Sequence, residues 1–234
     1  MSAFSIYNIE KLYYLKYNKN NIIYQSSCLF ITTCCIRLLF HHIDEEQVCL
    51  FDSWLSYPLI GIFCSSLGEM AFVYQITLIT KMIARKFNCF KIYTIMDIVM
   101  GLIFIAQIFC WYGVLYKKHL MHIIEESIWM IAIPSIGLSY LYFCKLVNNN
   151  LIKHKFIIAF LISISYTLFM MFIYLPMNYN KYNLLFKDTH CKTVTSSYLI
   201  WETEIPWITG YFIGATFLSI RLNSFQEFLI DNIF

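Results

Sequence analysis

Long apolar blocks, each close to the length of a membrane-spanning helix, dominate the pattern of hydrophobic and polar positions along this chain. An α-helix rises about 1.5 Å per residue and the hydrocarbon core of a bilayer is about 30 Å thick, so a span needs about 20 mostly apolar residues. The blocks are continuous rather than alternating, which predicts helices and not the strands of a membrane β-barrel. Six blocks meet the requirement: residues 22–40, 57–80, 91–116, 123–147, 156–176 and 205–222.

We therefore predict an all-α fold, a polytopic transmembrane bundle of about six helices. The prolines agree with these boundaries, because Pro58 and Pro206 fall in the first turn of a helix, where a missing N–H costs nothing. Pro176 is expected to end the fifth helix, and Pro134 predicts a kink inside the fourth.

No break in composition divides the apolar region, so residues 22–222 are predicted to form a single transmembrane domain. Residues 1–21 contain no apolar core of a secretory signal, and their tyrosines and leucines could form a short interfacial helix. Residues 223–234 are expected to be a C-terminal tail.

The composition supports a membrane protein, since 59% of the residues are hydrophobic, 13% are charged and the mean hydropathy is +0.62. A soluble domain carries about twice that share of charge. These values exclude intrinsic disorder, a coiled coil and a nucleic-acid binder with a basic surface. The net charge of +3 is too small to imply an acidic partner, so the expected partner is the lipid bilayer.

Basic residues predict the orientation, because cytoplasmic loops carry an excess of lysine and arginine. With six spans, the side that holds both termini carries eleven of the 17 basic residues, so both termini are predicted to be cytoplasmic. The opposite, outer side collects nine of the 14 acidic residues and all five tryptophans.

Glu69 lies at the centre of the second block, where a charged side chain costs at least about 2.5–3.5 kcal/mol on insertion scales. Helical periodicity places small residues on the same face, and such residues let another helix approach closely. Glu69 is therefore expected to face protein rather than lipid. The residues that share its face are Gly61, Ser65, Gly68 and Phe72.

Asp97 lies about 10 Å to the cytoplasmic side of the midpoint of the third block. Gln75 falls at the same depth, and Gln107 matches Ser65, so two polar levels are expected across this helix hairpin. One interpretation is an ion or proton path formed by Glu69, Asp97, Gln75 and Gln107. In the other, the acids are protonated or hydrogen-bonded packing groups and the amides join helices.

The outer ends of the helices carry the densest group of polar and aromatic residues. If the fourth helix begins near Lys118, then His119, His122 and Glu126 form one stripe, which Trp129 continues. Arg37 is a candidate counter-ion for one of the outer carboxylates. The predicted outer vestibule comprises Arg37, His119, His122, Glu125, Glu126, Trp129, Glu202, Glu204 and Trp207.

This outer rim has three interpretations. It could be a solvated acidic surface, a vestibule that concentrates cations and holds an organic cation on tryptophan faces, or the metal site of an enzyme with His119, His122 and Glu126 as ligands. Against the enzyme, the chain has no HExxH, no Gly-x-Ser-x-Gly and no Walker-type loop. No family resemblance is evident, and the sequence points to no particular cofactor.

Most of the nine cysteines lie in or near the apolar blocks and are expected to behave as small hydrophobic residues. Cys49 and Cys191 fall in outer loops and could form a disulfide in an oxidising compartment. Gly210 and Gly214 form a GxxxG motif that could serve internal packing or a homo-oligomer.

The leading functional hypothesis is a small transporter or channel for a cation or protons, with Glu69 as its mid-membrane acid. The first alternative is a membrane-embedded enzyme that acts on a lipid-like or isoprenoid-like ligand through the outer histidines and glutamates. The second is a structural subunit of a membrane complex. All three are integral membrane proteins, and the sequence does not indicate which membrane holds them.

Overall fold

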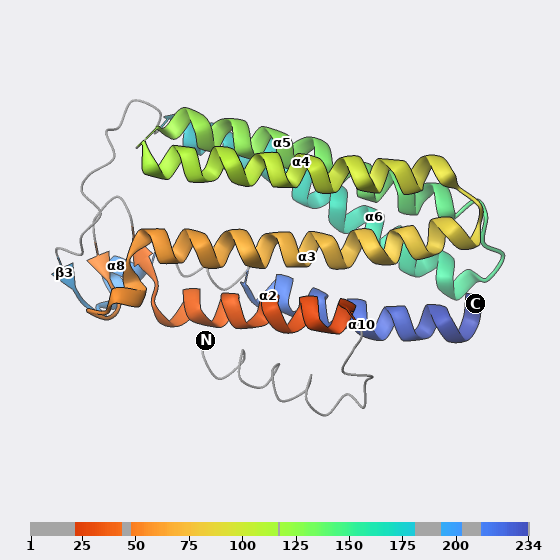
Figure 1. Cartoon of the computed structure of the whole chain (residues 1–234), viewed down its shortest axis with the longest axis horizontal. Coiled ribbons are helices and arrows are strands. Elements are labelled where there is room, and N and C mark those ends of the chain that lie inside the picture. Colours follow the sequence, from red (N-terminus) through yellow and green to blue (C-terminus); the bar gives the residue numbers. More distant parts are fainter. Residues whose placement is uncertain (1–21, 44–47, 117, 181–192, 203–211, 234) are drawn as a thin grey trace. The chain divides into compact units, whose positions relative to one another are not determined.

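The computed structural model describes residues 22–43, 48–116, 118–180, 193–202 and 212–233, and most of them are helical. From residue 58 to residue 169, the successive long helices are joined by short connections (Figure 1). The long helices are α2 (Ile22–Leu39), α3 (Pro58–Lys86), α4 (Phe90–Leu115), α5 (His119–Phe143), α6 (Asn150–Phe169) and α10 (Gly214–Ile233).

Within the described residues, five helices are long and apolar enough to cross a bilayer. Each of the first five predicted blocks lies largely within one of them, which agrees with an all-α, multi-pass integral membrane protein. The sixth block lies partly outside the described residues. From Gly214 on, its described part belongs to α10, which continues through residues predicted as a tail and ends at Ile233. The five are Ile22–Leu39, Leu59–Lys86, Phe90–Leu115, His119–Phe143 and Asn150–Tyr174.

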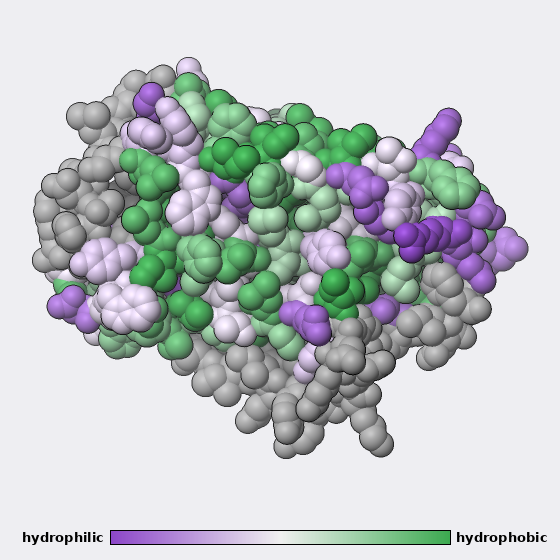
Figure 2. All heavy atoms as spheres, in the orientation of Figure 1, coloured by the Kyte–Doolittle hydropathy of each residue, from purple (hydrophilic) through white to green (hydrophobic). Residues whose placement is uncertain are grey.

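Large apolar side chains cover the outside of these helices. Ile98 and Phe104 of α4 and Leu161 of α6 are more than half exposed. Figure 2 shows hydrophobic residues over much of the visible helix surface. An exposed apolar surface of this extent is what a lipid-facing helix presents, because hydrocarbon chains replace water around it.

The fifth predicted helix does not end at Pro176, and that prediction was wrong. A π turn, η2 (Met170–Tyr174), follows α6, and α7 (Leu175–Asn180) then carries the helix past the proline. The N–H of Leu175 donates to the carbonyl of Met170, five residues back. Such local adjustments let a helix in a membrane accommodate a residue that has no N–H to donate. Helix α5 likewise runs through Pro134.

A small sheet, absent from the predicted all-helical bundle, forms between the loops. It consists of β1 (His42–Ile43), β2 (Val48–Cys49) and β3 (Thr193–Val194), in that order. Strand β2 pairs antiparallel with β1 and parallel with β3. The sheet thus brings the connection between α2 and α3 next to residues 145 positions later in the sequence, with Val48 opposite Thr193 and Cys49 opposite Val194.

The chain divides into two compact units, Met1–Gln75 with Phe186–Phe234 (unit 1) and Ile76–Leu185 (unit 2). In the core of unit 1, Phe30 stacks on Phe72 with ring centroids 4.8 Å apart. Unit 2 contains α4, α5 and α6, and its core includes the fully buried Phe143 and Phe156, whose ring centroids are 5.9 Å apart.

Candidate functional site

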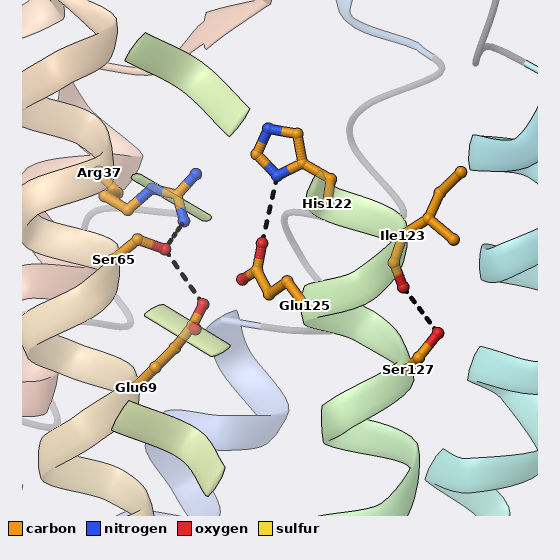
Figure 3. A network of polar contacts seen from close by, with 7 residues as sticks. All are labelled: Arg37, Ser65, Glu69, His122, Ile123, Glu125 and Ser127. Carbon is orange, nitrogen blue, oxygen red and sulfur yellow. Dashed lines mark hydrogen bonds and ion pairs between the residues drawn. The ribbon is translucent and has the colours of Figure 1, made fainter. Parts of the chain in front are cut away.

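Arg37, Ser65 and Glu69 form a continuous chain of hydrogen bonds in unit 1 (Figure 3). Arg37 Nη1 donates to Ser65 Oγ at 2.6 Å, and Ser65 Oγ donates to Glu69 Oε1 at 3.1 Å. Arginine can only donate, so the serine oxygen must accept from it and is left with its own proton for the carboxylate. The chain therefore has one direction, from the guanidinium through the hydroxyl to Glu69.

Local sequence explains how the three side chains meet. Ser65 and Glu69 are four residues apart on α3 and therefore share one face of the helix. Arg37 lies in the last turn of α2. Gly68 lets α2 approach, since a Cβ atom on it would lie 2.5 Å from Thr33 Oγ1. The Arg37 guanidinium carbon also lies 5.5 Å from the centroid of the Phe212 ring.

Two pockets adjoin this chain, and Arg37 lines both of them. The first has a volume of about 40 Å³ and is also lined by His41, His42 and Tyr57. The second has a volume of about 10 Å³ and is lined by Ser65 and Glu69 among others. About 10–15 Å³ is the least that holds one water molecule, so the pocket at Glu69 has room for a single water and not for a hydrated ion.

Gln75, placed by the sequence at the depth of Asp97, belongs to a fully buried polar cluster in unit 1. Its amide nitrogen donates to Ser27 Oγ at 2.6 Å and to the carbonyl of Ser219 at 2.9 Å, and its oxygen accepts from Ser219 Oγ at 2.9 Å. Asn223 donates to Ser27 Oγ at 2.6 Å. The cluster joins α2, α3 and α10, which matches the interhelical role that was one of the two interpretations of Gln75.

Asp97 lies on α4 in unit 2 and forms an ion pair with Lys81. The Asp97 side chain is 58% exposed, and the Lys81 ammonium lies 4.9 Å from the centroid of the Tyr93 ring. This arrangement is that of a surface ion pair. Gln107, by contrast, is buried in unit 2 with 4% of its surface exposed.

The residues of the predicted outer vestibule have different environments. In unit 2, His122 Nδ1 lies 3.2 Å from Glu125 Oε2, Glu126 and Trp129 are buried, and His119 is half-buried. Of the remaining predicted residues, Arg37 and Glu202 lie in unit 1. Glu202 is exposed, while Glu204 and Trp207 lie outside the described residues.

Arg37 contacts Ser65, a partner that the sequence analysis did not predict, and one of the outer carboxylates proposed as its counter-ion, Glu204, lies outside the described residues. The buried Trp201 was also not among the predicted site residues. Its Nε1 donates to the carbonyl of Thr195 at 2.9 Å, and its ring centroid lies 5.5 Å from that of His41. Trp201 therefore holds the residues that follow β3 close to His41, which lines the pocket of about 40 Å³.

Cys49 is disulfide-bonded, and Cys191 lies outside the described residues. The other seven described cysteines form no disulfide. Between the spans, burial raises the pKa of the Cys89 and Cys144 thiols. Both thiols are therefore protonated at neutral pH and poor nucleophiles.

The described residues thus bring together one acid, one hydroxyl and one fixed cation beside a pocket of single-water size in unit 1. Such a group can hold and pass a proton, since the hydroxyl and a water molecule both donate and accept. No protein-family model matches the chain, and comparisons with curated proteins and with solved structures found no significant similarity.

Proposed function

We propose that this multi-pass membrane protein moves protons, with Glu69 as the group that takes up and releases them. The observation that carries the proposal is the hydrogen-bonded chain from Arg37 through Ser65 to Glu69, which lines a pocket inside a span. Ionisable residues within transmembrane segments mark ion or proton paths by default, because an isolated charge there is expensive.

Protons fit this site better than metal cations do. Arg37 carries a permanent positive charge and lines both pockets, so it repels a cation that approaches Glu69. The pocket at Glu69 admits about one water molecule, whereas a metal ion would need several oxygen ligands or its hydration shell. A proton needs only an unbroken series of groups that donate and accept.

Arg37 also explains how Glu69 is tolerated in its charged form. The guanidinium and the carboxylate together have no net charge, and the serine hydroxyl connects them. Protonation of Glu69 would remove the negative charge and leave Arg37 uncompensated. A change in the protonation of Glu69 is therefore expected to change the position of the Arg37 side chain between the two pockets.

The test is proton flux into proteoliposomes that contain a pH-sensitive dye, driven by a potassium diffusion potential. Glu69→Gln should abolish the flux because an amide cannot take up a proton in this range of pH. Ser65→Ala should reduce the flux less, since a water molecule in the small pocket can replace the hydroxyl. Asp52→Asn is the matched control, because it removes one negative charge at an exposed position and should leave the flux unchanged.

Flux by Glu69→Gln equal to that of the unaltered protein would remove Glu69 from the mechanism. Elution of each variant as a single species in detergent and an unchanged melting temperature would show that a loss of flux is not a loss of folding. A correctly folded protein without any flux would instead favour the structural-subunit hypothesis, in which the charged pair serves assembly.

A further inference from the structure

A cysteine, a histidine and a glutamate converge in unit 2, and none of them belongs to the proton site proposed above. Cys110 lies on α4, and His122 and Glu125 lie on α5. One ligand atom from each lies within 4.8 Å of the other two, and all three residues are half-buried. We propose that Cys110, His122 and Glu125 bind one divalent transition-metal ion, with zinc as the best fit.

The geometry of the two residues on α5 matches metal coordination closely. His122 Nδ1 and Glu125 Oε2 are 3.2 Å apart (Figure 3). With Zn–N and Zn–O bonds of about 2.0–2.1 Å and tetrahedral angles, two such ligand atoms lie about 3.3 Å apart. The pair can therefore take up a metal ion with almost no movement. Cys110 Sγ needs to approach to about 3.6 Å, which a change in its side-chain torsion can supply.

Gly113 leaves space for the imidazole ring of His122. A Cβ atom on Gly113 would lie 2.9 Å from His122 Nε2 and 3.1 Å from His122 Cδ2. Any residue larger than glycine at this position would displace the imidazole. The N–H of Lys118 donates to the carbonyl of Gly113 at 2.8 Å, which fixes the tight connection between α4 and α5 at this level.

The donor set selects the kind of metal. A thiolate, an imidazole and a carboxylate suit Zn²⁺, whereas Mg²⁺ and Ca²⁺ prefer oxygen ligands alone. A divalent ion bound to one thiolate and one carboxylate leaves the site with no net charge, which favours binding near the end of a span. With only these three protein ligands, the fourth position would be open to water or a small ligand, as in catalytic rather than structural zinc sites.

This set differs from the one that the sequence suggested, which used His119, His122 and Glu126. His122 and Glu126 lie three and seven residues after His119 and share a stripe with it in an isolated helix. In the structure, however, Glu126 is buried and His122 lies beside Glu125. Cys110 could not be found from spacing, because it lies on the neighbouring helix and twelve positions before His122.

The experiment uses Co²⁺ as a spectroscopic substitute for zinc on the purified full-length protein in detergent. Tetrahedral Co²⁺ bound to a thiolate gives visible ligand-field bands and a near-ultraviolet sulfur-to-cobalt band. We expect one Co²⁺ per chain, displaced by Zn²⁺. Cys110→Ser should remove the sulfur band and weaken zinc binding by at least about 100-fold, since even changes outside the ligand set cost 10–100-fold.

Two control variants test the assignment. Cys144→Ser removes another free, half-buried thiol and should retain both the sulfur band and the affinity. His119→Gln should also retain them, whereas His122→Gln should not. The proposal is overturned if the unaltered protein binds no Co²⁺, if the sulfur band survives in Cys110→Ser, or if His119→Gln abolishes binding. Tryptophan fluorescence and elution volume report whether each variant is folded.

Discussion

The two compact units bury different kinds of side chain. Unit 1 holds the amides and hydroxyls of Gln75, Ser27, Ser219 and Asn223, none of which has any exposed surface. In unit 2 the largest buried groups include aromatic rings, and Phe143 lies between Tyr140 and Phe156 with ring centroids 6.2 Å and 5.9 Å away. Lipid removes the hydrophobic force that joins helices in water, so helix association needs either hydrogen bonds or close packing. We infer that buried hydrogen bonds contribute more in unit 1 and close packing more in unit 2.

The difference extends to the candidate sites. The proposed proton site of unit 1 consists of groups that donate and accept hydrogen bonds beside a small pocket, as do the groups of its buried polar cluster. The proposed metal site of unit 2 would use three ligands on two closely packed helices, with space left by Gly113.

The largest effect is expected from the disulfide bond, which is found only in unit 1 among the described cysteines. Reduction should lower the free energy of unfolding by about 2–4 kcal/mol, because the bond restricts the unfolded chain. Thermal melting with and without a reducing agent measures this.

The partner of Cys49 is predicted to be Cys191, since β2 pairs with β3, which begins two residues after Cys191. Mass spectrometry of a digest without reduction should yield one linked peptide that contains both residues. A peptide that links Cys49 to any other cysteine would contradict the prediction.

The sequence predicted those features that depend on the thickness of the bilayer. The position of each of the first five spans follows from the length of an apolar block, because a helix must cross a fixed distance. The predicted end of the fifth helix at Pro176 was wrong. A missing N–H was expected to end the helix, whereas a π turn at Met170–Tyr174 precedes the proline and the helix continues past it. That adjustment depends on the backbone geometry of the whole turn, which residue type alone does not specify.

The candidate site was predicted in part. Glu69 was expected to face protein, because small residues share its side of the helix, and in the structure it lines a pocket together with Phe30 and Arg37 of α2. Arg37 was assigned to the outer rim from the depth of its backbone. Its long side chain reaches the hydroxyl of Ser65, and depth counted in residues cannot show how far a side chain extends.

A smaller effect is expected where unit 2 depends on close packing. A Cβ atom on Gly137 would lie 2.5 Å from Ser163 Oγ and 2.7 Å from Ser163 Cβ. Because Ser163 Cβ cannot rotate away, Gly137→Ala should destabilise the protein by about 1–3 kcal/mol through overpacking of α5 against α6. Melting in detergent measures the effect.

Gly101→Ala is the matched control for this variant, since a Cβ atom there has no neighbour within 4 Å. It should be neutral or slightly stabilising, because alanine favours a helix. Adding Ser163→Gly to Gly137→Ala should restore part of the lost stability. Equal melting temperatures for Gly137→Ala and Gly101→Ala would show that α5 and α6 do not approach closely at this point.

The smallest of the three effects is expected from the hydrogen bonds of unit 1. Gln75→Leu removes two donors and one acceptor from the buried cluster, so Ser219 Oγ loses its acceptor. Interhelical hydrogen bonds in membranes contribute about 0.6 kcal/mol on average and about 1.7 kcal/mol at most, and we expect a loss of about 1–2 kcal/mol. Gln25→Leu, the same change at an exposed position of α2, should alter stability by less than about 0.5 kcal/mol.

A double-mutant cycle separates the hydrogen bonds from the change in packing volume. If the bonds matter, Gln75→Leu with Ser219→Ala should cost less than the sum of the two single changes, because removing both partners leaves no buried hydroxyl without an acceptor. Additive costs would mean that Gln75 stabilises unit 1 only by filling space. In that case helices would associate by the same means within each unit. The contrast between the units would then concern which residues are buried and not what joins the helices.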